Sequence, residues 1–359
     1  MRHLGHTPPF RHPGGGLVDG SIAEVAYLRL GGLEQWVMIR GESVDNPPLI
    51  VLHGGPGLSE TAFLRYFDAP LEKAFTVVYW DQRGAGRSYD HRIPRWSMTV
   101  AQFMEDLDEL VEVIRERLGK KPVVIFGHSW GSALGALYAA RFPQKVALYV
   151  GGAQIGDWAS AESSSYAFAL AEARRRGNDK ALRQLTAMGP PPYSAKSLFA
   201  ERLWVSRLER RMGPGELWKT GRAVLRAPES SLLDLVGAVQ GFRFSLETMW
   251  QEVSRLNLLE RVPALRMPVF FLIGSKDHWV PPRTSLDYFD ALSAHAKKLV
   301  WFANSGHEMF IDEPARFIET MVQVVRPAYS PGPPAVGAPR LAGAAGRAGR
   351  AAAEDGAPA

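Results

Sequence analysis

Short runs of apolar residues without polar alternation are the feature that most constrains the fold of this 359-residue chain. Such runs indicate strands that are buried on both faces, as in a parallel sheet covered by helices. Segments with helical periodicity lie between the runs, and this alternation is typical of α/β proteins with a mostly parallel sheet. The six runs are residues 49–52, 75–80, 123–126, 147–152, 269–274 and 298–302.

Local signals upstream of and between these runs predict a hairpin and a long helix. Two strand-like stretches flank Gly31 and Gly32, which predicts an N-terminal β-hairpin. Thr99 and Gln102 have the spacing of a capping box, so a helix is expected to begin after Thr99. An apolar stripe follows, and Gly119 stands where that helix is expected to end.

The same alternation predicts a core with one insertion and two tails. Residues 21–152 and 262–326 carry the strand and helix signals of an α/β core. Residues 153–261 are rich in Ala, Leu and Arg with helical periods, which predicts a helical cap. Residues 1–20 are expected to form a flexible arm. Residues 327–359 contain few large apolar residues, so a disordered Pro/Ala/Gly-rich tail is expected there.

Composition excludes several classes of function. The chain contains no cysteine, which rules out a thiol nucleophile and thiolate metal sites. The formal net charge of +5 is small for this length, and no nucleic-acid motif accompanies it. No apolar stretch reaches the roughly 18 residues of a membrane span, and the N-terminus lacks a secretory signal. We therefore expect a cytoplasmic protein without nucleic-acid or membrane partners. The sequence does not indicate an oligomeric state.

The sequence Gly-His-Ser-Trp-Gly at 127–131 stands where an apolar run gives way to a helical segment. This context is the one that a nucleophile elbow requires. Glycines at both ends allow close approach of the chain, and Ser129 would then stand above the sheet beside the N–H groups of a helix start. A glycine-rich turn of purely structural value is the alternative, and we favour Ser129 as a nucleophile.

A serine nucleophile needs a base and a group that orients the base. In folds with this elbow the chain order is serine, acid, histidine. Asp277 follows the fifth apolar run and His307 follows the sixth, at the edge of a parallel sheet where ligands gather. Asp277 could also be a plain turn residue, and the neighbours His278 and Glu308 fit the expected positions less well. We predict a Ser129–Asp277–His307 triad.

A site for a developing oxyanion is expected after the first run, where His-Gly-Gly-Pro-Gly occupies 53–57. The predicted donors are the N–H groups of Trp130 and Gly55, with Gly54 as the rival of Gly55. A phosphate-binding loop is the competing interpretation, but the Gly-Lys-Ser/Thr ending is missing. Farther along, Asp81 and Arg83 are expected to pair with each other and to shape a loop near the site.

Three of these segments together resemble the proline iminopeptidase branch of the α/β-hydrolase superfamily. They are His-Gly-Gly-Pro-Gly at 53–57, Asp-Gln-Arg-Gly-Ala-Gly-Arg-Ser at 81–88 and Gly-His-Ser-Trp-Gly-Ser at 127–132. The resemblance spans the predicted core. It implies an α/β-hydrolase fold and a serine aminopeptidase that removes an N-terminal residue, often proline, and it carries the acid and the histidine over onto Asp277 and His307. No metal or organic cofactor is expected.

The resemblance weakens in the cap, where the family's acidic residues hold the cationic amine of the substrate. Glu201 and Glu247 are candidates for that role, with Glu252 a further one and Gly54 a candidate for substrate contact. Each glutamate also fits a solvent-facing helix position, and we favour that interpretation. The cap resembles those of related bacterial hydrolases without assigned substrates.

Three functions stay open on the sequence. The first is an aminopeptidase that acts on short peptides, and the second is a carboxylesterase or other small-molecule ester or amide hydrolase with the same triad. They differ in whether a carboxylate faces the substrate amine. The third is a non-catalytic binding protein, against which the complete Ser129–Asp277–His307 set argues. Dehalogenase or epoxide hydrolase chemistry would need a carboxylate where Ser129 stands.

Overall fold

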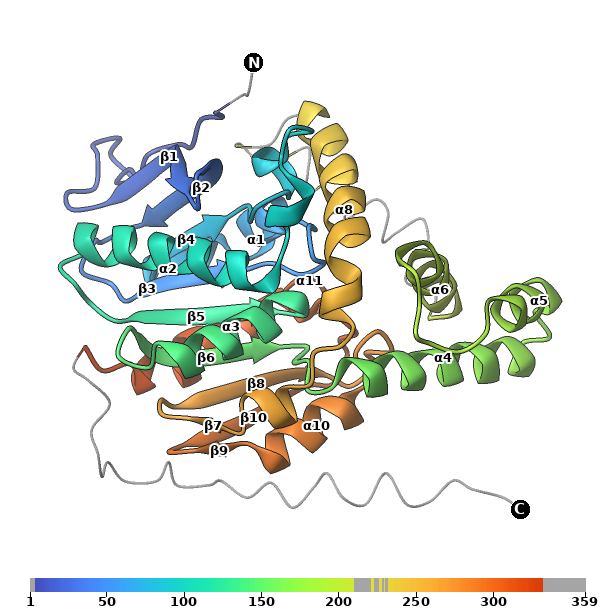
Figure 1. The fold of residues 1–359 in the computed structure, drawn as a ribbon. Coiled ribbons are helices and arrows are strands. Elements are labelled where there is room, and N and C mark those ends of the chain that lie inside the picture. Colours follow the sequence, from blue (N-terminus) through green and yellow to red (C-terminus); the bar gives the residue numbers. More distant parts are fainter. Residues whose placement is uncertain (1–3, 210–220, 223–225, 228, 230–231, 332–359) are drawn as a thin grey trace.

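The computed structural model describes residues 4–209, 221–222, 226–227, 229 and 232–331, and an eight-stranded sheet forms its centre (Figure 1). The strand order is β1-β2-β4-β3-β5-β6-β8-β10. β2 pairs antiparallel with β1 and with β4, whereas every pair from β4 to β10 is parallel. The strands are β1 (Ile22–Leu30), β2 (Leu33–Gly41), β3 (Pro48–Leu52), β4 (Thr76–Trp80), β5 (Val123–His128), β6 (Val146–Gly152), β8 (Val269–Gly274) and β10 (Lys297–Phe302).

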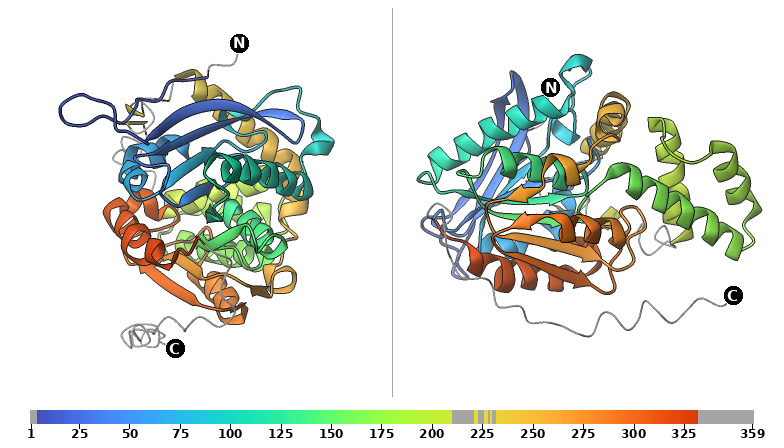
Figure 2. Two further views of the ribbon diagram at one scale, coloured as in Figure 1. Left: turned by 90° about the vertical axis from the view of Figure 1, so that its left-hand side faces the viewer. Right: turned by 60° about the horizontal axis from the view of Figure 1, so that its bottom comes forward.

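Helices cover both faces of this sheet (Figure 2). α2, α3 and α10 pack on one face, and α1, α11 and α12 pack on the other. The helices are α1 (Thr61–Phe67), α2 (Val100–Arg117), α3 (Trp130–Arg141), α4 (Trp158–Arg175), α5 (Asp179–Met188), α6 (Ala195–Leu208), α8 (Leu232–Val253), α9 (Leu258–Arg261), α10 (Pro282–Ala291), α11 (Met309–Asp312) and α12 (Pro314–Glu319). Two short strands, β7 (Ala264–Leu265) and β9 (Ser293–Ala294), pair beside the sheet.

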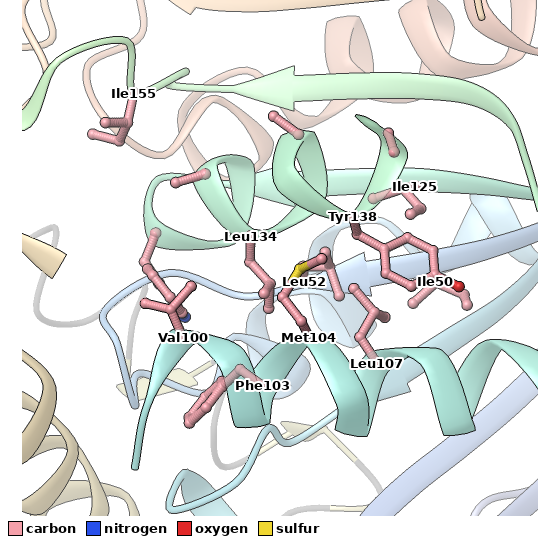
Figure 3. Close-up of a cluster of buried hydrophobic side chains, with 14 of the residues drawn as sticks. Ile50, Leu52, Val100, Phe103, Met104, Leu107, Ile125, Leu134, Tyr138 and Ile155 are labelled. Atoms are coloured by element: carbon pink, nitrogen blue, oxygen red, sulfur yellow. The ribbon is translucent and has the colours of Figure 1, made fainter. Parts of the chain in front are cut away.

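The central strands are largely apolar because successive side chains enter opposite halves of the core. In β5, Val123 and Ile125 join the cluster beneath α2 and α3, whereas Val124 and Phe126 join the cluster on the other face. Figure 3 shows the first of these clusters, formed where α2 lies beside α3 over the sheet. A strand with alternating polarity would place polar groups in one of the two clusters.

The predicted elements of the core are confirmed. All six apolar runs are strands, and Gly31 and Gly32 form the turn between β1 and β2. The Thr99 side chain accepts a hydrogen bond from the Gln102 N–H, as its capping position requires. Gly119 follows the end of α2 with a φ of +71°, a left-handed conformation that favours glycine. The predicted α/β fold, with a mostly parallel sheet, an N-terminal hairpin and a helical insertion, is therefore present.

The insertion lies between the neighbouring strands β6 and β8 and contains α4, α5, α6, α8 and α9 in its described residues. α4, α5 and α6 share a small apolar core of their own and extend away from the sheet (Figure 1). α8 returns along the core and contacts α2 and α6. None of the helices in the described part of the chain is long and apolar enough to span a membrane.

The N-terminal segment differs from the flexible arm expected for residues 1–20, because residues 4–10 lie against the core. The Leu4 carbonyl accepts a hydrogen bond from Trp36 Nε1 at 2.8 Å. Thr7 is buried, where its hydroxyl donates to Glu229 Oε1 at 2.6 Å and accepts from Arg40. Polar partners on β2 and in the insertion thus hold the segment in place. Of the tail expected at 327–359, residues 332–359 lie outside the described residues.

Candidate active site

Ser129 lies in a tight turn between the last residue of β5 and the first residue of α3. Its φ of 53° and ψ of −117° are unusual for a residue with a side chain. A Cβ atom on Gly127 would overlap the Gly131 carbonyl, and one on Gly131 would overlap the Leu52 carbonyl. Glycine is therefore required at both positions for the turn that presents Ser129.

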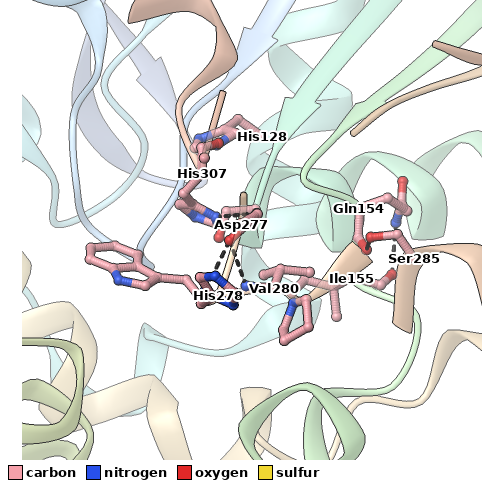
Figure 4. A network of polar contacts seen from close by, with 12 residues as sticks. His128, Gln154, Ile155, Asp277, His278, Val280, Ser285 and His307 are labelled. Carbon is pink, nitrogen blue, oxygen red and sulfur yellow. Dashed lines mark hydrogen bonds and ion pairs between the residues drawn. The ribbon is translucent and has the colours of Figure 1, made fainter. Parts of the chain in front are cut away.

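Asp277 and His307 lie together at the ends of neighbouring parallel strands (Figure 4). Asp277 follows β8 and His307 follows β10, and Asp277 Oδ2 lies 2.9 Å from His307 Nδ1. The other carboxylate oxygen accepts the N–H groups of Trp279 and Val280, each at 2.9 Å. Both side chains are buried. The carboxylate is thus held in a position that can orient the imidazole.

Ser129 and His307 line the same cavity. Within the described residues, the structure shows no direct hydrogen bond between the Ser129 hydroxyl and the imidazole. Such contacts often tighten only when substrate binds. Of the three residues predicted to act together, the structure thus brings Asp277 and His307 into contact and places Ser129 in the cavity beside them.

The predicted oxyanion donors lie on two sides of this turn. Gly54 and Gly55 line the cavity, and Trp130 is the first residue of α3, where helix N–H groups have no intrahelical acceptor. The Trp130 indole is fully buried and donates to Gln82 Oε1 at 3.0 Å. The Gln82 N–H in turn donates to His53 Nε2 at 3.0 Å. The tryptophan therefore ties the serine turn to the glycine-rich loop that follows β3.

The expected pairing of Asp81 with Arg83 is wrong, because each binds other partners. Arg83 forms a buried ion pair with Asp106 of α2, with N···O distances of 2.7 and 2.8 Å. Asp81 accepts hydrogen bonds from the hydroxyls of Ser59 at 2.5 Å and Thr61 at 3.0 Å. Asp81 thus shapes the loop before α1, and Arg83 fastens the segment after β4 to α2.

A cavity of about 460 Å³ lies over Ser129, between the sheet edge and the cap. Its charged wall residues are Glu60, Glu162, Arg202 and Glu308. The rest of the wall is largely apolar, and aromatic side chains contribute much of it. The apolar wall consists of Leu58, Ile155, Trp158, Ala161, Leu198, Phe199, Leu203, Phe242, Leu246, Trp250, Trp279 and Val280.

The cap places two carboxylates against one guanidinium at this cavity. Arg202 binds Glu162 Oε1 through one nitrogen and Glu201 Oε2 through another, the latter at 2.7 Å. Burial raises the pKa of Glu162 to about 7, with Glu201 adding to the rise and with Arg202 and the Trp158 indole opposing it. Glu162 Oε2 accepts no hydrogen bond of normal geometry from the described residues. This cluster holds one carboxylate more than it has cations.

The glutamates proposed from the sequence have different surroundings. The solvent-facing interpretation is wrong for Glu201, which is fully buried and accepts a hydrogen bond from the Ser165 hydroxyl at 2.7 Å. Glu247 is 42% exposed, pairs with Arg243 and does not belong to the described wall of the Ser129 cavity. Glu252 accepts the Val100 N–H at the start of α2 at 3.0 Å. Of these three, only Glu201 belongs to the charged cluster beside the cavity.

Sequence reasoning missed Glu162, Arg202 and the buried pair of Glu60 and His128. One signal was available in the cap. The buried residues of α6 recur at helical spacing and include Leu198, Glu201 and Trp204, so the stripe would have placed Glu201 inward. Glu60 follows the His-Gly-Gly-Pro-Gly segment, and His128 lies within Gly-His-Ser-Trp-Gly. No local pattern in the sequence shows that the two side chains meet.

Comparison with known proteins assigns the family. A family model described as "alpha/beta hydrolase fold" matches residues 47–215. The chain is also 32% identical over 311 residues to a probable aminopeptidase, YbaC, of Bacillus subtilis strain 168, covering 85% of this chain and 97% of that relative. The chain belongs to the α/β-hydrolase family.

Two further similarities agree with this assignment. The proline iminopeptidase of Neisseria gonorrhoeae is 36% identical over 120 residues, which is 33% of this chain and 36% of that protein. The crystal structure of VinJ superposes with a TM-score of 0.61 at 21% identity, covering 86% of this chain and 99% of that chain. The latter similarity establishes the fold alone. This α/β-hydrolase thus shares its fold with VinJ over most of the chain and sequence similarity with the iminopeptidase over a shorter segment.

Proposed function

We propose that this α/β-hydrolase is a serine aminopeptidase that removes the N-terminal residue of short peptides through an acyl-enzyme. Ser129 Oγ attacks the carbonyl carbon while His307 Nε2 takes the hydroxyl proton, and Asp277 holds the Nδ1–H of the imidazole. His307 then passes the proton to the leaving amine. A water molecule attacks the acyl-enzyme with His307 as base, which releases the N-terminal residue and restores Ser129.

The N–H groups of Trp130 and Gly55 are the proposed donors to the oxyanion. Both belong to segments that the Trp130–Gln82–His53 contacts hold together. Rigid donors stabilise the charge that develops on the carbonyl oxygen, and losing one such donor typically costs about 2.7–4 kcal/mol of transition-state stabilisation. None of these steps draws on a metal or organic cofactor.

The observation that carries the peptidase assignment is the surplus carboxylate at the cavity. Glu162 and Glu201 share Arg202, so the cluster holds one carboxyl group more than it has cations. A buried carboxylate is costly unless a cation and hydrogen bonds compensate it. The ammonium group of a substrate N-terminus supplies both to the Glu162 carboxyl, which lines the cavity. Neutral esters would gain nothing from this group.

The apolar wall supports a substrate residue with an apolar side chain. Trp158, Leu246 and Trp250 are buried residues of this wall. Burying an apolar side chain there stabilises the complex by about 25 cal/mol per Å² of surface removed from water. The wall fits an acyl chain equally well, so a carboxylesterase is the second candidate. The carboxylate cluster favours the amine.

The two candidates are separated by a side-by-side assay with purified protein. Proline and other apolar amino-acid anilides are compared with short-chain nitrophenyl esters. We expect turnover of the anilides, with apolar residues preferred over charged ones. Ester cleavage without any anilide turnover would reject the peptidase assignment while leaving a serine hydrolase.

A further inference from the structure

Glu60 and His128 form a buried pair directly beside the proposed nucleophile. His128 is the last residue of β5 and precedes Ser129, and Glu60 is the residue before α1. His128 Nδ1 lies 2.6 Å from Glu60 Oε1, and His128 Nε2 lies 2.9 Å from the carbonyl oxygen of His307. The side chains are 1% and 4% exposed. The mechanism proposed above assigns no role to either residue.

The two contacts fix the number of protons that the pair carries. A carbonyl oxygen only accepts, so His128 Nε2 must carry a hydrogen to bind His307. The short contact at Nδ1 then needs one more hydrogen, either on Nδ1 or on the Glu60 carboxyl. A neutral imidazole facing an ionised carboxylate would leave two acceptors in contact. The pair therefore holds one proton beyond that of a neutral histidine.

Several charged or titratable groups face the His128 ring. Burial alone would lower the pKa of His128, but Glu60, with contributions from Glu308 and from the His307 carbonyl, raises it to about 9. His53 lies close enough to interact electrostatically with His128. The His307 ring centroid lies 4.8 Å from that of His128. At neutral pH the proton of the pair is thus retained.

We propose that the Glu60–His128 pair positions His307: the proton shared between Glu60 and His128 Nδ1 keeps a hydrogen on His128 Nε2, and this Nε2–H anchors the His307 backbone carbonyl. Asp277 fixes the imidazole of His307 at Nδ1, and His128 fixes its backbone. His128 adjoins Ser129 in the chain. The proposed nucleophile and its base are therefore both attached to the same end of β5. Hydrogen bonds to Asp312 and Glu313 hold residues 304–306 of the loop after β10, and the His128 contact extends this support to the His307 backbone itself.

The test compares two variants that leave no bare carboxylate. In Glu60→Gln, the amide can donate to His128 Nδ1, so the Nε2–H can stay on the His307 carbonyl without any extra proton. In Glu60→Gln combined with His128→Phe, the aromatic shape is kept but the anchor is lost. Glu247→Gln, an exposed cap glutamate outside the cavity wall, is the matched control. If the double variant fails to fold, Glu60→Gln with His128→Asn, whose side chain is too short to bridge both partners, replaces it.

The readout is the rate at which a fluorophosphonate probe labels Ser129. In this reaction Ser129 Oγ bonds to phosphorus, fluoride leaves, and His307 takes the hydroxyl proton. Displacing a catalytic group by about 1 Å typically costs about 100-fold in rate. We therefore expect labelling about 100-fold slower in the double variant, a clearly smaller loss in Glu60→Gln, and a rate within a few-fold of wild type in the Glu247→Gln control.

A pH profile adds a readout that packing alone would not change. The wild-type rate should fall as the pH rises through about 9, where the pair loses its proton, and Glu60→Gln should lack that decrease. Wild-type labelling in the folded double variant, or an equal loss in both variants, overturns the proposal. So does a change confined to the KM of anilides. This inference assumes the serine mechanism but not the peptidase: a wild type that labels but cleaves no anilide refutes the peptidase alone.

Discussion

Asp277 Oδ2 lies 2.9 Å from His307 Nδ1, and the opposite oxygen of the same carboxylate is held by two backbone N–H groups. The carboxylate therefore has one orientation available, and that orientation places an acceptor at His307 Nδ1. This arrangement keeps the hydrogen of a neutral imidazole on Nδ1 and leaves Nε2 able to accept a proton.

Replacing Asp277 by asparagine tests this relationship. The amide in Asp277→Asn can donate to His307 Nδ1 and so favour the wrong tautomer, and we expect kcat to fall by about 10⁴-fold. Circular dichroism should show an unchanged fold. A folded variant with kcat within 10-fold of wild type would contradict the role given to Asp277.

Replacing Glu162 by glutamine tests the amine-binding carboxylate. In Glu162→Gln we expect KM for amino-acid anilides to rise by about 10- to 100-fold, the range typical of one lost charge-assisted hydrogen bond at 1.5–3 kcal/mol. Cleavage of a nitrophenyl ester without an amine should change little. Steady-state kinetics on both substrates distinguish the outcomes: equal losses on the two substrates would show that Glu162 supports the fold rather than the amine.

The same residue predicts a pH dependence. Burial raises the pKa of Glu162 to about 7, so the carboxylate is protonated below that pH and gains its charge as the pH rises. The substrate amine loses its own proton at about 7.7–8.0. Amine binding should therefore be tightest between about pH 7 and 8, and 1/KM for anilides should fall on either side. Persistence of the acidic decrease in Glu162→Gln would refute the assignment.

The Arg83–Asp106 ion pair predicts a large effect on stability. Both side chains are at most 1% exposed, so Arg83→Met would leave a buried carboxylate without its cation. Removing one partner of such a pair typically lowers the free energy of unfolding by about 3–5 kcal/mol. Urea denaturation measures the difference. Arg243→Met, which breaks the exposed ion pair with Glu247, should leave the midpoint of urea denaturation unchanged.

The serine turn makes a prediction about Gly131. A Cβ atom there would overlap the backbone carbonyl of Leu52 in the neighbouring strand, which cannot move away without breaking the sheet. Gly131→Ala should therefore lose both activity and thermal stability. Gly16→Ala, at a position with open space around it, is the control and should have the same melting temperature as the wild type. Equal melting temperatures for the two variants would contradict the close approach.

Much of the core could be predicted from the sequence because its signals are local. Continuous apolar runs specify doubly buried strands, and residues that directly follow parallel strands meet at one sheet edge. That reasoning led from the sequence to Asp277 and His307, which the structure places in contact. The turn at Ser129 was predictable from its glycines, although only Gly127 answers to a local approach, that of the Gly131 carbonyl, whereas Gly131 faces the Leu52 carbonyl of β3.

The cap and the paired carboxylates could not be predicted in the same way. Glu162 and Arg202 stand on different helices, and only the packing of α4 against α6 brings them together. Glu60 and His128 are 68 residues apart in the chain and meet across the sheet edge. The Asp81–Arg83 expectation failed because proximity in sequence was taken for contact, whereas Arg83 reaches Asp106 on α2.

The central claim is a serine aminopeptidase that recognises a free N-terminal amine. It is tested most directly by kcat/KM for an apolar amino-acid anilide and for its N-acetylated counterpart, measured with the wild type and with Ser129→Ala. We expect cleavage of the free-amine substrate by the wild type, little or no cleavage of the acetylated one, and none by folded Ser129→Ala. Equal cleavage of both substrates, or cleavage by Ser129→Ala, would contradict it.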